Sequence, residues 1–386
     1  MPSLEFASFR ARALSDLALR EALWAEHADE AFVALALRLG AERGFAFEAG
    51  DVHAALAGAG RSVDHGPAPE RPDLLDGFVP AAVHWFEGAP VVTWCRLDAQ
   101  RFGEPFFEET LRVAQRLPFN RALAPLTALR DLPARDAQRP GLRIAGFVFH
   151  LSRCGSTLVA QAFAALPQVL VLSEPPPLDA IVRAHEQLPG LARTTQVAWL
   201  RAMLAALAQP RADEEQVVVK LDAWHASHLD LIEAAFPGVP WVFLVREPAD
   251  VLVSHRHQYS FMMAALNAPS LLGCTPQAAM RMHQDEYRAQ VLGRILTAMV
   301  ERGAGDRTID YRALPAAIWE TIAPRFGIAL SDGDRARVRA AATRNAKVPD
   351  QSFVPDTEAK RRDVDEVVRA CAARWMRAPY EQLTGG

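Results

Sequence analysis

The second part of the chain alternates short apolar runs with helical segments, and this alternation restricts the fold more than any other feature. Segments predicted as strands occupy residues 144–150, 169–172, 217–221, 241–246 and 307–311, and all but the last are mainly apolar. Helices are expected to begin near Thr157, Trp224, Ala249, Thr275 and Pro315, with a final helix near residues 363–376. Strands that alternate with helices are typical of a parallel sheet. We therefore predict an α/β domain over residues 142–386, with helices flanking a parallel sheet.

The residues before this domain follow other patterns. Residues 1–60 carry apolar positions at a helical period, which predicts a small helical domain. Two apolar runs within residues 83–97 predict a hairpin, and an amphipathic helix is expected at 104–116. Together they make residues 78–130 a hairpin-plus-helix segment to which the sequence assigns no role. Segments rich in Gly, Pro and charge predict linkers at residues 58–77 and 131–141.

The turn after the first strand has the pattern of an anion site. Residues 147–161 read FVFHLSRCGSTLVAQ, and the turn and helix start comprise Ser152, Arg153, Cys154, Gly155, Ser156 and Thr157. Backbone N–H groups at such a turn, together with a helix N-terminus, can bind an anion. The segment departs from the nucleotide-hydrolase pattern GxxxxGK[ST], because His150 and Ser156 replace its first glycine and its lysine. A purely structural turn with a Ser/Thr cap is the alternative.

A second strand ends in an arginine. Arg246 closes its strand, Pro248 begins a helix, and Ser254 follows the arginine by eight residues. Open α/β sheets bind ligands at the carboxyl ends of their strands. A guanidinium can bind phosphate in bidentate fashion, at about 1.5–3 kcal/mol per charged hydrogen bond. Ser254 can donate from the same side. The alternative is an ion pair of Arg246 with Glu247 or Asp250 at the surface.

Lysine is rare in this chain. Lysine and arginine total 42 residues, but only Lys220, Lys347 and Lys360 are lysine. Where an arginine-rich chain keeps a lysine, the position can require a compact ammonium on a flexible stem. Three surviving surface lysines are the alternative.

The two strand ends together resemble the sulfotransferase superfamily, over roughly residues 144–360. Its members bind the 5′-phosphosulfate of PAPS (3′-phosphoadenosine-5′-phosphosulfate) with a PxSGT or PRSGTT loop, and the 3′-phosphate with an RDPRDxxxS-type motif. Here these segments read LSRCGST (151–157) and REPADVLVS (246–254), with Glu247 at the usual Asp position. The chain looks most like the tyrosylprotein-type and related bacterial branch. Two spacings of that branch recur, because Glu174 follows Arg153 by twenty-one residues and Lys220 precedes Arg246 by twenty-six.

The resemblance implies a PAPS-dependent sulfotransferase with a P-loop-type sheet and no metal. By analogy with phosphoryl transfer, the transition state is loose and in line, so positioning and charge stabilisation carry most of the catalysis. Arg153 and Lys220 would stabilise the leaving 5′-phosphate, and Glu174 would be the base for an acceptor hydroxyl or amine. A structural role for Glu174 beside Pro175 is the alternative. The acceptor, a small molecule or a peptide, stays open.

The resemblance also assigns the rest of the donor site. Residues 152–157, Arg246 and Ser254 would hold the nucleotide. A late basic loop of the family corresponds to residues 344–362 and would bring Lys347 and Lys360 to the 3′-phosphate, although its usual glycines are missing. A solvated basic face is the alternative for this loop. A rival set of bases follows Lys220, namely Asp222, His225 and His228.

Residues 15–56 look like the helical leader domain of Nif-eleven-type precursor peptides. The likeness rests on the segments 17–23 and 36–40 and on Gly44-Phe45-Ala46-Phe47, with Gly58-Ala59-Gly60 where such leaders are cleaved. It implies a peptide or protein partner. A helical cap packed on the catalytic domain is the alternative.

Several classes of function are disfavoured by composition. A net charge of −4 provides no basic field for nucleic acid, and no apolar run reaches the roughly 18 residues of a membrane span. Four cysteines without a CxxC pair, and a start without a secretory pattern, indicate a reduced cytoplasmic protein. The histidine pairs at 225/228 and 255/257 lack further ligands at metal-binding spacing.

Two further hypotheses stay open beside the sulfotransferase. An ATP-dependent P-loop phosphotransferase could use Asp222, after the strand VVVKL, to bind magnesium. A non-catalytic scaffold could use the N-terminal helices to bind a partner. Cys154 could ionise easily at a helix N-terminus beside Arg153, or it could simply pack the turn.

Overall fold

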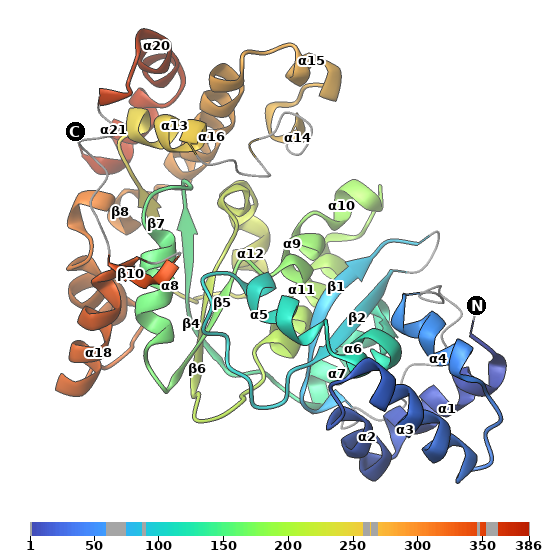
Figure 1. The fold of residues 1–386 in the computed structure, drawn as a ribbon. Helices are drawn as coiled ribbons and strands as arrows, with labels where there is room; N and C mark the ends of the chain where they lie inside the picture. Colours follow the sequence, from blue (N-terminus) through green and yellow to red (C-terminus); the bar gives the residue numbers. More distant parts are fainter. Residues whose placement is uncertain are drawn as a thin grey trace. The chain divides into compact units, whose positions relative to one another are not determined.

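The computed structural model describes residues 2–58, 75–86, 90–257, 263, 269–345, 348–352 and 362–385. They divide into two compact units (Figure 1). The first contains Met1–Leu142 and Pro175–Asp213, and the second contains Arg143–Glu174 and Glu214–Gly386. The domain boundaries expected from the sequence stay predictions.

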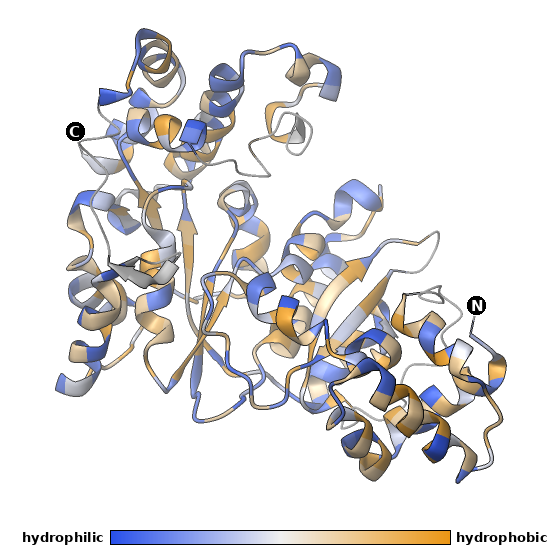
Figure 2. Ribbon diagram, viewed as in Figure 1, coloured by the Kyte–Doolittle hydropathy of each residue, from blue (hydrophilic) through white to orange (hydrophobic). Residues whose placement is uncertain are grey.

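The second unit is built on a five-stranded parallel sheet. Its order is β5 (Val169–Ser173), β6 (Gln216–Lys220), β4 (Arg143–His150), β7 (Trp241–Val245) and β8 (Thr308–Asp310). β5, β6 and β7 are buried along their whole length, and Figure 2 shows hydrophobic strands at the centre of this unit. The prediction of a parallel α/β sheet is confirmed, and each expected strand begins within one residue of the observed one.

Helices cover both faces of this sheet. Gly146 in β4 leaves no room for a Cβ, because the ring of Phe326 packs directly against it. The next residue, Phe147, points to the other face and contacts Phe236 at 5.4 Å between ring centroids. Phe163, in α8 (Ser156–Ala164), stacks on Phe326 at 6.1 Å, and α8 packs against α18 (Asp332–Ala342).

The connections create a reversal of direction beside β4. From β4 the chain crosses to β5, returns through β6, and then forms β7 on the other side of β4. Ligands of open α/β sheets bind at the carboxyl ends of the strands at such a switch point. The ends of β4, β6 and β7 are therefore the place to look for a site.

The remaining helices of the second unit lie between and after the strands. They include the 3₁₀ turn η3 (Ala223–His228), α12 (Leu229–Ala235), α13 (Pro248–His257), α14 (Pro269–Leu272), α15 (Pro276–Met280), α16 (Gln284–Glu301), α17 (Ala323–Arg325), α20 (Glu366–Trp375) and α21 (Arg377–Thr384). The short strands β9 (Arg344–Asn345) and β10 (Val348–Ser352) pair with each other. The predicted final helix corresponds to α20, and α21 was not expected.

The first unit combines helices with a three-stranded antiparallel sheet. Its helices are α1 (Leu4–Ser15), α2 (Leu17–Trp24), α3 (Asp29–Ala41), α4 (Ala49–Leu56), α5 (Phe107–Ala114), α6 (Pro118–Leu123), α7 (Leu132–Gln138), α9 (Pro176–Val182), α10 (Ala184–Gln187) and α11 (Arg193–Leu207). Its sheet has the order β1 (Phe78–His84), β2 (Val91–Arg96) and β3 (Leu126–Ala128). The predicted helical segment and hairpin are confirmed, and the hairpin gains a third strand.

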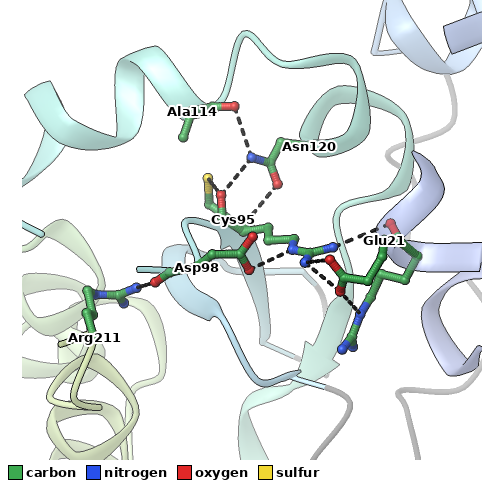
Figure 3. A network of polar contacts seen from close by, with 8 residues as sticks. Glu21, Cys95, Asp98, Ala114, Asn120 and Arg211 are labelled. Carbon is green, nitrogen blue, oxygen red and sulfur yellow. Dashed lines mark hydrogen bonds and ion pairs between the residues drawn. The ribbon is translucent and has the colours of Figure 1, made fainter. Parts of the chain in front are cut away.

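The N-terminal helices are held to this sheet by a buried arginine (Figure 3). Arg96, at the end of β2, donates to both carboxylate oxygens of Glu21 in α2 at 2.7 Å and to Asp98 at 2.8 Å. Its backbone exchanges hydrogen bonds with the Asn120 side chain of α6. Only 4% of the Arg96 side chain is exposed. Residues 4–56 thus pack on the hairpin-containing segment that follows them in the first unit.

The linker predicted at residues 131–141 is wrong, because α7 occupies most of it. Pro133 lies in the first turn of this helix, where proline is favoured. Arg135 is buried and places its guanidinium 4.9 Å from the ring centre of Trp94. Packing against the sheet, which the local composition does not reveal, stabilises this helix. None of the helices within the described ranges has the length and apolar character needed to cross a bilayer.

Candidate functional site

The turn between β4 and α8 has a left-handed backbone at three positions. The φ angles are 73° at Ser152, 54° at Arg153 and 86° at Gly155. A fourth site residue, Glu174, has a φ of 54°. Three of the four non-glycine residues with such angles in the described part of the chain therefore lie at this sheet edge. Each costs about 1–3 kcal/mol, and such residues cluster at ligand sites.

Gly155 is required both by its angle and by its surroundings. A Cβ here would lie 2.7 Å from Leu314 Cδ1 and 3.0 Å from the ring of Tyr311. Ser156 and Thr157, which begin α8, are buried. A tight turn that leads into a helix N-terminus can direct backbone N–H groups at an anion.

Cys154 points away from any ligand. Its side chain is fully buried, and Sγ donates to the carbonyl oxygen of Leu244 in β7 at 3.2 Å. Burial raises the pKa of the Cys154 thiol to about 12. Burial therefore supports the alternative in which Cys154 simply packs the turn. Only the backbone of Cys154 is available to a ligand.

Lys220 and Glu174 form an ion pair at the ends of neighbouring strands. Lys220 Nζ lies 2.6 Å from Glu174 Oε1, and 3.4 Å from the hydroxyl oxygens of Thr157 and Ser173. The pairing follows from strand register, since Ser173 of β5 stands opposite Lys220 of β6. The Glu174 N–H also donates to the Lys220 carbonyl oxygen at 2.8 Å. The scarce lysine thus lies beside the turn that carries Thr157.

The two partners differ in burial. The Lys220 side chain is 1% exposed, whereas that of Glu174 is 24% exposed. Burial alone would raise the pKa of Glu174, but the Lys220 ammonium and the His150 ring outweigh it and hold that pKa well below its usual range. Glu174 is therefore an ionised hydrogen-bond acceptor at neutral pH.

His150 belongs to this cluster, although the sequence pattern did not single it out as functional. Nδ1 accepts the Ser152 N–H at 3.0 Å, and Nε2 lies 3.3 Å from Glu174 Oε1. Burial lowers the pKa of His150, although Glu174 acts in the opposite direction. Its position as the last residue of a buried strand before the turn is the signal that could have indicated it.

Arg246 is buried next to the same turn. It is 4% exposed, its Nε lies 3.4 Å from Asp250 Oδ2, and its Cζ lies 4.2 Å from the ring centre of Tyr311. The Tyr311 ring also faces Gly155, so this residue joins the turn to Arg246. Ser254 is buried one turn of α13 beyond Asp250. The Arg246–Asp250 pair expected in the structural alternative is present, but it is buried rather than at the surface.

A cleft of about 470 Å³ opens beside Arg246. It is lined by Arg246, Glu247, Ala249, Asp250, Asp310, Tyr311, Arg312, Val364, Arg369, Arg377 and Tyr380. Glu247 pairs with Arg377 of α21 at 3.1 Å, and Asp310 accepts from Arg312 at 2.8 Å. Burial acts to raise the pKa of Asp310, but hydrogen bonds from Arg312 and Tyr380 lower it overall. The cleft therefore combines ionised acid–arginine pairs with two aromatic rings.

The other predicted site residues fall into two groups. Asp222 and His225 are buried after β6, with His225 Nε2 3.8 Å from Asp222 Oδ2, and His228 ends η3. Lys347 and Lys360 lie outside the described residues.

No protein-family model matches the sequence, and no curated protein sequence is detectably similar to it. Three solved structures similar to the chain are sulfotransferases or their domains. The domain from the curacin biosynthetic pathway is 12% identical and has a TM-score of 0.36, covering 61% of this chain and 98% of that one. STF9 of Mycobacterium avium is 14% identical and has a TM-score of 0.37, and the match covers 70% of this chain and 86% of that one. The sulfotransferase domain from the olefin synthase of Synechococcus PCC 7002 is 17% identical and has a TM-score of 0.33, and the match covers 62% of this chain and 89% of that one. Such scores support no particular activity, so the proposal of function depends on the site.

Proposed function

We propose that the chain is a PAPS-dependent sulfotransferase of the tyrosylprotein and bacterial type, which transfers a sulfuryl group to a hydroxyl or amine of a small molecule or peptide. The observation that carries the proposal is the buried Lys220–Glu174 pair beside a left-handed turn at the switch point of a parallel sheet. A cation, an ionised carboxylate and backbone donors at one sheet edge provide what transfer from a phosphosulfate requires.

The turn and Lys220 would act on the leaving group. As the bond between sulfur and the bridging oxygen breaks, negative charge develops on the departing 5′-phosphate. The Lys220 ammonium, the Arg153 guanidinium and the N–H groups of residues 153–157 stabilise this charge. Lys220 sits 3.4 Å from Thr157 Oγ1, which places its ammonium at the start of α8. Adenosine 3′,5′-bisphosphate is the product.

Glu174 would receive the proton of the acceptor. The acceptor oxygen or nitrogen forms the new bond to sulfur, and its proton passes to the Glu174 carboxylate. In the free protein Lys220 makes this carboxylate a weak base. When an anionic donor binds, Lys220 can turn towards the donor oxygen. Its attraction for Glu174 then weakens, which raises the pKa of the base when the base is needed.

Arg246 and Ser254 would hold the 3′-phosphate end of the donor. Arg246 is fixed by Asp250 and by the Tyr311 ring, and Tyr311 contacts the turn at Gly155. The cleft beside Arg246 offers room for part of the nucleotide. Lys347 and Lys360 are further proposed ligands of the 3′-phosphate.

Two calorimetric measurements test this proposal. Wild-type protein should bind adenosine 3′,5′-bisphosphate without metal, and Arg246→Ala and Ser254→Ala should each weaken binding. The loss of one charged hydrogen bond, about 1.5–3 kcal/mol, corresponds to a factor of about 10 to 100 for the arginine. Arg38→Ala, an exposed residue of α3, is the matched control. Absence of wild-type binding at millimolar ligand refutes the proposal, and magnesium-dependent binding of ATP would favour a phosphotransferase instead.

The proposed compartment is the cytoplasm, since all four cysteines are free. We also propose that residues 4–56 offer their outer surface to a peptide or protein partner, as leader-like helices would. Pull-down of an acceptor peptide by wild-type protein, but not by a variant with exposed residues of α1 and α2 replaced, tests this proposal.

A further inference from the structure

One buried ring contacts both halves of the candidate site. His150 is 4% exposed and ends β4. On one edge of the ring, Nδ1 accepts the N–H of Ser152 in the turn at 3.0 Å. On the other edge, Nε2 lies 3.3 Å from Glu174 Oε1. The anion-binding turn and the proposed base are therefore linked through a single side chain.

The contact with Ser152 fixes which nitrogen carries the hydrogen. A ring nitrogen that accepts a hydrogen bond has no proton, so a neutral His150 carries its hydrogen on Nε2. Nε2 lies 3.3 Å from the Glu174 oxygen that also contacts Lys220 at 2.6 Å. Side chains from β4 and β6 thus both contact one carboxylate oxygen.

We propose that His150 is a positioning residue for sulfuryl transfer: through Nδ1 it fixes the turn at Ser152, and through Nε2 it orients the Glu174 carboxylate. The inference rests on the proposed function. Ser152 has a φ of 73°, a conformation that costs about 1–3 kcal/mol and needs support from its surroundings. His150 supplies this support through Nδ1 and contacts Glu174 through Nε2, so its removal should disturb the geometry in two separable ways.

Two amide variants separate the two contacts. In His150→Asn, the side-chain oxygen can replace Nδ1 as the acceptor for Ser152, but nothing reaches Glu174. In His150→Gln, the side-chain NH₂ can replace the Nε2 donor to Glu174, while Ser152 loses its acceptor. His150→Ala removes both contacts. His185→Asn, an exposed histidine in the first unit, is the control.

Donor affinity and reaction rate are then measured separately. The probes are adenosine 3′,5′-bisphosphate in calorimetry and PAPS with water as acceptor, a reaction that releases sulfate and adenosine 3′,5′-bisphosphate. We expect His150→Asn to keep its Kd within about threefold and to lose rate at saturating PAPS by about 10- to 100-fold. His150→Gln should weaken binding about tenfold and keep more of the rate. The inference would be overturned if the two variants had equal effects, or if His150→Ala had the same donor affinity and reaction rate as the wild type.

A spectroscopic measurement distinguishes failure of this inference from failure of the proposed function. Nitrogen-15 NMR of histidine-labelled wild-type protein reports the protonated nitrogen of His150 without any ligand, and His150→Ala assigns its signal. A hydrogen on Nε2, and a change of that signal in Glu174→Gln, are expected. A hydrogen on Nδ1 overturns the inference even if the enzyme is active. Wild-type protein that has the expected tautomer but neither binds nor cleaves the probes refutes the function and, with it, a role of His150 in transfer.

Discussion

Removal of Glu174 should destabilise the second unit more than removal of Lys220. The two side chains form one ion pair, but they differ in their access to water, with 1% of Lys220 and 24% of Glu174 exposed. Without Glu174, an ammonium is left in the interior beside the neutral hydroxyls of Thr157 and Ser173. Without Lys220, the carboxylate keeps part of its hydration and the contact with His150.

The magnitudes follow from this difference in burial. Loss of one partner of a buried pair costs about 3–5 kcal/mol, which we expect for Glu174→Gln. Lys220→Met replaces the stem with apolar volume and leaves a partly solvated anion, so about 1–2 kcal/mol is expected. The double variant contains no unpaired charge. Its loss of stability should be smaller than the sum of the single losses by at least about 1 kcal/mol.

Hydrogen exchange followed by mass spectrometry measures these changes. Peptides that cover residues 169–173 and 216–220 report on the central sheet of the second unit, so the first unit does not contribute. Glu301→Gln, an exposed residue at the end of α16, is the matched control and should change stability by less than about 0.5 kcal/mol. Equal losses for the two single variants, or additive losses in the double variant, would refute the reasoning.

Three further results are expected. Gly155→Ala should weaken binding of adenosine 3′,5′-bisphosphate at least about tenfold by calorimetry, because the residue has a φ of 86° and no space for a Cβ; unchanged affinity would contradict this account of the turn. In the folded protein, Cys154 should resist alkylation at pH 8 while the partly exposed Cys274 reacts, as peptide mass spectrometry can show; equal labelling would contradict its burial. The free energy of unfolding, measured with urea, should fall in two stages as the pH is lowered. The lowered pKa of His150 means that the unfolded chain takes up a proton first, below about pH 6.5, and the lowered pKa of Glu174 adds a loss below about pH 4.3. Glu174→Gln should reduce the second stage, to which the lowered pKa of Asp310 also contributes, and an unchanged second stage in that variant would assign it to other groups.

The strands of the second unit were predictable because their signal is local. Each apolar run ends near a polar residue or a proline, and parallel packing requires helices between the strands. Glu174 and Lys220 were also proposed from spacing, but their pairing was not. Forty-six residues separate them, and only the register that places Ser173 opposite Lys220 brings them together.

Errors and open alternatives occurred where packing outweighs local preference. Residues 132–138 contain proline and charge, yet they form α7 because Arg135 is buried against Trp94. For Cys154 the local sequence left two roles open, and only the contact of its thiol with the carbonyl oxygen of Leu244 in the interior selects packing of the turn. In both cases the deciding partner lies far away in the sequence.

The amino-acid sequence by itself determined the class of fold, the location of the turn at 152–157 and the identity of the charged residues at the strand ends, because these depend on patterns within a few neighbouring positions. The tertiary structure decided which of these residues meet. It placed His150 between the turn and Glu174, buried Lys220 against that carboxylate, and used Tyr311 to join Gly155 to Arg246. Contacts of this kind arise from strand order and register, which are set by packing of the whole sheet and not by any single segment.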